Sequence, residues 1–267
     1  MKILADVFPE GKKAALTMSY DDGRDYDKRL VEIFNKNGIK GTFHLNSSRM
    51  TKPGNGCVTL EEIPEVYKGH EVSCHTLTHP FPEIVPETVL VNEILEDRRT
   101  LEKACGYTVR GMSYPYGNFS ERDIKIYTSC GMRYSRTTIS TNGFGLPENF
   151  MKWNPTCHHK GKLTELFDAL VARTGRYLCH DVMYVWGHSY EFENDNNWDV
   201  IEKFCSYAGG HDDIWYAANI EIYDYIMASR ALMVGVDGKT VYNPSCTPVW
   251  VRADGEVVKI LPGENTL

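Results

Sequence analysis

Residues 14–46, AALTMSYDDGRDYDKRLVEIFNKNGIKGTFHLN, carry the pattern that decides the fold. The apolar run 14–20 is typical of a buried strand. Residues 25–38 predict a helix with apolar residues on one face and Gly38 as its stop. Residues 40–46 predict a second strand. A strand, a helix and another strand in this order indicate a β–α–β unit, whose two strands run parallel.

The same alternation continues along the chain. Further strands are expected at 70–76, 109–117 and 177–189, and the longest helix at 86–106. About seven such pairs predict an α/β fold, a distorted (β/α) barrel of about seven strands. From Gly238 onward the pattern changes to short strands with an Asp254-Gly255 hairpin turn. We therefore expect a barrel over 1–236 and a small C-terminal β extension over 237–267, packed on it.

The composition limits the classes of function. The 267 residues are 42% hydrophobic and 24% charged, as in a globular protein. A formal net charge of -7 argues against nucleic acid or an anionic membrane surface as the partner. No apolar run reaches the ~20 residues that span a bilayer. Residues 1–23 do not resemble a signal peptide, so we expect a cytoplasmic protein, although trimming of a precursor would leave export open. The oligomeric state stays open.

Three segments place metal-capable groups after predicted strands: Asp21 and Asp22, then His75 and His79, then His188. Each also has an ordinary structural interpretation. The two aspartates could form a solvated turn before a helix. The two histidines could be a hydrogen-bonded pair near the surface, and His188 could be a core histidine.

Together the segments indicate more than each does alone. One carboxylate and two histidines form a three-ligand site with open positions, which is typical of catalytic metal centres. Imidazole nitrogen suits Zn, Co, Ni or Fe. The remaining carboxylate and the remaining histidine can supply a base and an acid. All five groups fall at the carboxyl ends of predicted strands, where a βα barrel has its active site.

Four motifs, Ser19–Gly23, His75–His79, Ser113–Gly117 and Val185–His188, carry a family resemblance. Over roughly residues 12 to 225 the chain resembles the polysaccharide deacetylases with a NodB-type homology domain, of the carbohydrate esterase type. The resemblance implies a hydrolase that removes N- or O-linked acetyl groups from a carbohydrate. It also implies one divalent metal ion, with Zn expected first and Co, Ni or Fe as alternatives, and an acetylated carbohydrate as the partner.

The resemblance implies a role for each motif residue. Metal binding falls to Asp22, His75 and His79. Asp21 would be the general base that takes a proton from the attacking water. The backbone N–H of Tyr116 would help to hold the oxyanion, and His188 would protonate the leaving group.

Two family features are missing from the sequence. An Arg usually opens the third motif and pairs with the base, but Ser113 stands there, and Arg110 lies three residues earlier. The family also has an Asp that tunes the catalytic histidine. No counterpart is visible here, and His158 or His159 could take over part of that role.

Aromatic residues lie close to these motifs in the sequence. Tyr114, Trp153 and Trp186 are candidates for a sugar subsite, because aromatic faces stack on sugar rings; the alternative is that they belong to the core. Two rival functions stay open. One is a degenerate member that binds carbohydrate without turnover, and the other is an amidohydrolase acting on a small non-sugar amide.

Overall fold

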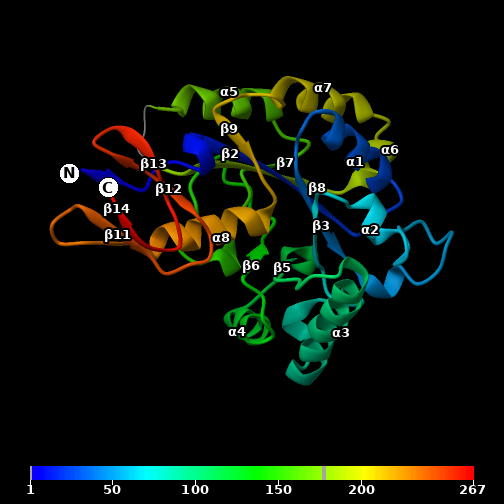
Figure 1. Ribbon diagram of the computed structural model, residues 1–267. Coiled ribbons are helices and arrows are strands. Elements are labelled where there is room, and N and C mark those ends of the chain that lie inside the picture. The colour runs from blue at the N-terminus through cyan, green and yellow to red at the C-terminus, as the bar shows by residue number, and fades with distance from the viewer. Residues whose placement is uncertain (1, 176–178) are drawn as a thin grey trace.

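The computed structural model describes residues 2–175 and 179–267, and a parallel sheet forms its centre (Figure 1). Seven strands lie in the order β6-β5-β4-β3-β2-β8-β7, with parallel neighbours. Their bounds are β2 Ala14–Asp21, β3 Gly41–Leu45, β4 Glu71–Cys74, β5 Gly111–Ser113, β6 Tyr134–Arg136, β7 Cys157–His158 and β8 Asp181–Gly187. The sheet curls into a half-barrel with helices around it, which confirms the predicted distorted (β/α) barrel.

Strand β2 is the centre of this sheet, and all its residues are buried. β8 pairs along one edge of β2 from Ala14 to Tyr20. On the other edge, β9 (Ile214–Tyr216) pairs with the first half of β2 and β3 with the second half. A strand covered on both faces is rich in apolar residues, and residues 14–20 are apolar apart from Thr17 and Ser19. Its carboxyl end delivers Asp21 to the mouth of the half-barrel.

Helices connect the strands, and the two predicted at 25–38 and 86–106 are present as α1 and α3. They are α1 Asp27–Lys36, α2 Ile63–Val66, α3 Glu87–Cys105, α4 Glu121–Ser129, α5 Leu163–Arg173, α6 Ser189–Asn194, α7 Trp198–Ala208 and α8 Asn219–Arg230. Gly106 ends α3 at φ 77°, the left-handed conformation that glycine adopts at little cost. Ser120 begins α4 with a capping box to Asp123.

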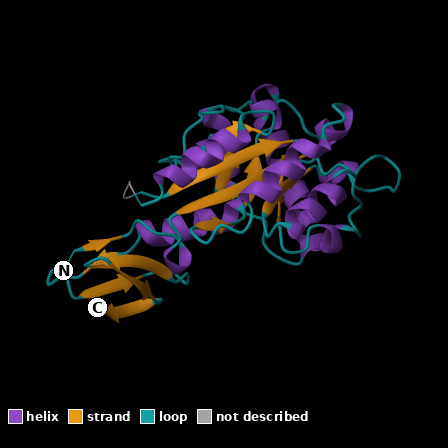
Figure 2. Cartoon of the chain, turned by 90° about the horizontal axis from the view of Figure 1, so that it is seen from above, coloured by secondary structure: helices purple, strands orange, loops and turns teal. Residues whose placement is uncertain are grey.

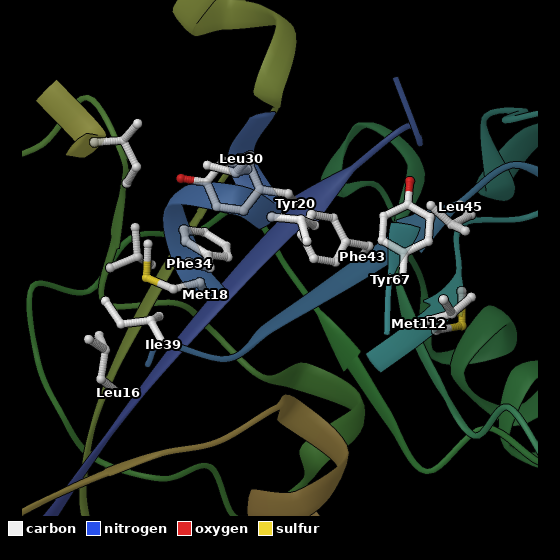
Figure 3. Packing of buried hydrophobic residues seen from close by; sticks show 14 of the residues in the cluster. Leu16, Met18, Tyr20, Leu30, Phe34, Ile39, Phe43, Leu45, Tyr67 and Met112 are labelled. Carbon is white, nitrogen blue, oxygen red and sulfur yellow. The ribbon is translucent and has the colours of Figure 1, made fainter. Parts of the chain in front are cut away.

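The main core includes side chains of β2, β3 and α1 together with those of other helices and strands, and Figure 3 shows part of it. The Tyr20 ring meets Phe34 edge-on at 5.8 Å between centroids, and Phe43 lies 4.8 Å from Tyr67. Large aromatic side chains packed from three elements fix the position of β2 relative to its neighbours. The end of β2 that carries the candidate site is therefore rigidly supported.

Two small antiparallel sheets form the C-terminal part, at one end of the molecule in Figure 2. Their strands are β1 Ile3–Leu4, β10 Met233–Val234, β11 Thr240–Asn243, β12 Val249–Ala253, β13 Glu256–Ile260 and β14 Gly263–Thr266. Asp254 and Gly255 form the predicted hairpin turn between β12 and β13, both at positive φ. Tyr225 of α8 accepts a hydrogen bond from the Trp250 backbone at 3.1 Å, which joins the extension to the main part.

One boundary differs from the prediction. Residues 3 and 4, which the sequence assigned to the barrel, pair with Arg252 and Ala253 of the extension. Such a pairing across nearly the whole chain leaves no local pattern in the sequence. The division at residue 236 stays a prediction. None of the helices within 2–175 and 179–267 combines the length and apolar content needed to cross a bilayer.

Candidate active site

A pocket of about 430 Å³ lies at the carboxyl ends of the parallel strands. Its lining consists of Asp21, Asp22, Arg49, His75, His79, Tyr114, Tyr116, Gly117, Thr138, Trp186, His188 and Tyr190. The structure thus brings together all the predicted site residues except Trp153. They come from the carboxyl ends of β2, β4, β5 and β8 and the loops that follow, because neighbouring parallel strands end at the same edge of a sheet.

Asp22, His75 and His79 each offer one ligand atom, and these three atoms lie within 4.8 Å of one another. The buried Oδ1 of Asp22 has no hydrogen-bond partner among the described residues; Nη1 of Arg49 lies 3.6 Å from it and Nε2 of His79 lies 4.0 Å from it. A buried carboxylate oxygen without a donor is costly unless a cation satisfies it. The donor set of one carboxylate and two imidazoles therefore fits a divalent transition metal.

Each histidine is held in a state that can bind a metal. Nδ1 of His75 donates to the carbonyl oxygen of Ser113 at 2.9 Å, which leaves Nε2 free. Burial lowers the pKa of His75, and burial together with His75 lowers the pKa of His79 to about 4. Both rings are therefore neutral near pH 7, the form that binds metals.

The backbone at this site adopts conformations that non-glycine residues rarely take. Asp22, Thr76, His79 and Tyr116 all have positive φ, between 58° and 80°. The segment from His75 to His79 is consequently an irregular loop. Left-handed residues that gather in one pocket point to a functional constraint, because each costs free energy that packing must offset.

Asp21 lies beside the three candidate metal ligands and is paired with Arg136 from β6. The side chains of Arg136 and Asp21 are 0% and 4% exposed, and Nη2 of the arginine donates to Oδ2 of the carboxylate. The hydroxyl of Ser113 donates to the other oxygen at 3.1 Å. Burial alone would raise the pKa of Asp21, but Arg136, helped by His75 and other histidines, outweighs it and holds this pKa well below its usual range.

Arg136 thus provides the guanidinium that the third motif lacks. Arg110, the candidate from the sequence, instead forms a bidentate ion pair with Asp224 at 2.7 Å, away from the pocket. The only sequence signal for Arg136 was a basic residue at the end of a predicted strand next to the third motif. Ser113 lies on β5 and Arg136 on the neighbouring β6, so the place of the arginine beside Asp21 follows from the order of the strands in the sheet.

His188 is held by a carboxylate that the sequence left without a role. Nδ1 of His188 donates to Oε2 of Glu191 at 3.0 Å, and Nε2 of His158 donates to the same oxygen at 3.1 Å. Burial lowers the pKa of His188, but Glu191, with Asp21 and Asp22, raises it overall. Glu191 therefore holds His188 in place and raises its pKa. The three-residue spacing from His188, at the start of α6, was the available signal.

The aromatic residues divide into pocket and core. Trp186 lines the pocket and lies 4.4 Å from the guanidinium of Arg136, and Tyr114 lines it although it is almost fully buried. Tyr116 is 57% exposed and stacks on Phe81, with ring centroids 4.2 Å apart. Trp153 is 1% exposed and packs edge-on against Tyr134, Phe150 and Tyr184. The prediction that Trp153 lines a sugar subsite is therefore corrected: it is a core residue.

Comparison with known proteins agrees with this geometry. The family model "Polysaccharide deacetylase" matches residues 9–135, which confirms the resemblance to the polysaccharide deacetylase family. His188 and Glu191 lie beyond the matched stretch. A peptidoglycan-N-acetylglucosamine deacetylase from Bacillus cereus is 24% identical over 136 residues, covering 48% of this chain and 46% of that protein. The chain spans less than half the length of the curated relatives that it matches.

Solved structures share the fold. A Mycobacterium smegmatis structure assigned as a polysaccharide deacetylase has a TM-score of 0.63 at 15% identity, covering 85% of this chain and 94% of that one. A pseudoenzyme of the CE4 family from Bacillus anthracis has a TM-score of 0.51 at 18% identity, covering 81% and 66%. Since both identities are low, these likenesses speak for the fold alone.

Proposed function

We propose that this chain is a metal-dependent deacetylase that hydrolyses N- or O-linked acetyl groups of a carbohydrate. The observation that carries the proposal is Oδ1 of Asp22, which accepts no hydrogen bond among the described residues and lies 3.6 Å from Nη1 of Arg49, beside two neutral histidines and a second, arginine-paired carboxylate. Asp22, His75 and His79 would hold one divalent ion, with zinc as the first choice. Such an ion lowers the pKa of bound water and polarises a carbonyl.

The residues of the chain then have separate tasks. Asp21, kept ionised by Arg136 and Ser113, takes a proton from water as the water oxygen bonds to the acetyl carbon. The backbone N–H of Tyr116 stabilises the negative charge on the former carbonyl oxygen. His188 gives a proton to the departing nitrogen or oxygen as its bond to carbon breaks. The products are acetate and a free amine or hydroxyl.

The rim of the pocket supports a sugar as substrate. The stacked pair of Phe81 and Tyr116 stands beside His79, and Trp186 and Tyr190 line the pocket as well. Exposed aromatic rings at a polar pocket suit the apolar faces of pyranose rings. The relative named for peptidoglycan N-acetylglucosamine makes N-acetylglucosamine the first sugar to test.

The test is acetate release from acetylated chito-oligomers and from acetylated xylan, before and after chelation, with zinc added back. We expect activity that chelation removes and zinc restores. His75→Ala should lose most bound metal and activity while its circular dichroism is unchanged, and His211→Ala, a histidine outside the pocket, should behave like the wild type. Full metal affinity in His75→Ala would disprove the ligand assignment. Binding of oligomers without acetate release would favour a degenerate, carbohydrate-binding member, and release only from a small amide would favour an amidohydrolase.

A further inference from the structure

A second group of metal-capable side chains lies beside the pocket. It consists of His158 at the end of β7, His188 after β8, and Glu191 in α6. One ligand atom from each lies within 4.8 Å of the other two. The three side chains are 23%, 22% and 17% exposed, so an ion from solvent can reach them.

The donors match those of known zinc sites. Two imidazole nitrogens and one carboxylate oxygen are a recognised three-ligand set for zinc. Both short contacts of the histidines converge on Oε2 of Glu191, at 3.0 and 3.1 Å. Lys160 takes the other oxygen, Oε1, at 3.0 Å, which holds the carboxylate still and leaves Oε2 to serve as a single-oxygen ligand.

A fourth group nearby lacks a partner. His159 is 1% exposed, and both its ring nitrogens lack a hydrogen-bond partner among the described residues. Its Nε2 lies 3.6 Å from Oε2 of Glu191. A buried imidazole that makes no hydrogen bond among the described residues and faces the shared oxygen is an independent sign that the group can take up a cation.

We propose that His158, His188 and Glu191 form a second, weaker site for zinc-like divalent ions, and that filling it inhibits the enzyme. The inhibition, unlike the binding, rests on the proposed function. An ion on Nδ1 of His188 replaces the proton that this nitrogen donates to Glu191, so the ring can no longer become the doubly protonated imidazolium that gives a proton to the leaving group. Excess zinc would therefore remove the leaving-group acid.

The two sites should fill in a fixed order. Oδ1 of Asp22 in the first site has no hydrogen bond to lose among the described residues, only a 3.6 Å ion pair with Arg49. In the second site, the ion replaces the hydrogen bonds from His188 and His158 to Glu191. The His158 proton must also move to Nδ1, which breaks a 3.2 Å hydrogen bond from the Lys160 backbone. The second ion thus binds at higher free zinc than the first.

The test measures zinc bound at dialysis equilibrium across a range of free zinc. We expect one equivalent at low free zinc and a second at higher free zinc. His158→Ala should keep only the first, His75→Ala only the second, and His211→Ala both. Cobalt added to His75→Ala should give the visible absorption of a tetrahedral site. This absorption should be absent from the double variant that carries both His75→Ala and His158→Ala. Only one bound equivalent of zinc in the wild type, or a second equivalent that His158→Ala does not remove, would overturn the proposed second site.

Acetate release, measured in parallel, tests the inhibition. Wild-type activity should rise and then fall as free zinc increases. In His158→Ala, with activity expressed relative to that variant's own maximum, the fall should begin at a free zinc concentration at least tenfold higher. A second equivalent bound with no fall in activity would overturn the inhibitory role. Two bound equivalents in a protein that releases no acetate from any substrate would uphold the site and contradict the proposed function instead.

Discussion

Replacing Arg136 by Met removes the positive partner of Asp21 and keeps much of the side-chain volume. Both side chains are buried, at 0% and 4% exposed, so the carboxylate would be left as an uncompensated buried charge. Removing one partner of such a pair costs about 3–5 kcal/mol of the free energy of unfolding. At roughly 2–4 °C per kcal/mol for a domain of this size, Tm should fall by roughly 6–20 °C.

The loss of stability in Arg136→Met should depend on pH in a defined direction. In the wild type the pKa of Asp21 lies below its unfolded value, so its pairing stabilises the protein above the unfolded pKa and is lost as pH falls through the folded one. Without Arg136, burial dominates and the pKa of Asp21 rises. The Arg136→Met penalty should therefore be largest near neutral pH and shrink in acid, where Asp21 is protonated in both states.

Urea denaturation of the chelated protein measures this, and a double-mutant cycle isolates the pair. In the background of Asp21→Asn, where no charge is stranded, Arg136→Met should cost much less. Arg136→Lys keeps the positive charge but loses the planar, two-donor guanidinium and its contact with Trp186. Its free energy of unfolding should therefore lie between those of Arg136→Met and the wild type. A coupling free energy below about 1 kcal/mol would refute the idea that Arg136 serves to hold the Asp21 carboxylate.

Three further outcomes are expected. Glu191→Gln should lower the pKa of His188, and since an acid must be protonated to act, the alkaline limb of the pH–rate profile should move to lower pH; an unmoved limb would show that Glu191 does not raise the pKa of the catalytic acid. Asp21→Asn should keep the metal and lose about two to four orders of magnitude in rate, whereas loss of the metal would make Asp21 a ligand. Trp153→Phe should cost roughly 0.5–3 kcal/mol of stability and leave KM unchanged, and a raised KM would return Trp153 to the substrate pocket.

The fold could be predicted from the sequence because its signals are local. The apolar run 14–20 requires burial on both faces, and the stops at Gly38 and Gly106 are set by single residues with positive φ. The Asp254-Gly255 turn is equally local. The pairing of residues 3 and 4 with β12 was missed, because it joins the two ends of the chain.

The candidate site was predictable only where its groups are neighbours in the sequence. Asp21 and Asp22 are adjacent, and a short loop carries both His75 and His79. Arg136 depends on the adjacency of β5 and β6, which places it opposite Ser113 in the register. Trp153 lies near the motifs in the sequence, yet its ring enters the core, since the direction of a side chain in an irregular segment depends on tertiary packing.

The pairing of β1 with β12 also bears on how the protein is made. Ile3 finds its partner in Ala253, about 250 residues later in the chain. At roughly 5–20 residues per second of translation, the first strand waits on the order of 10–50 s for that partner to be synthesised. Meanwhile its backbone donors and acceptors stay open to other strands. We therefore expect the half-barrel to fold while the ribosome is still at work, and the sheet that contains β1 to close only after release.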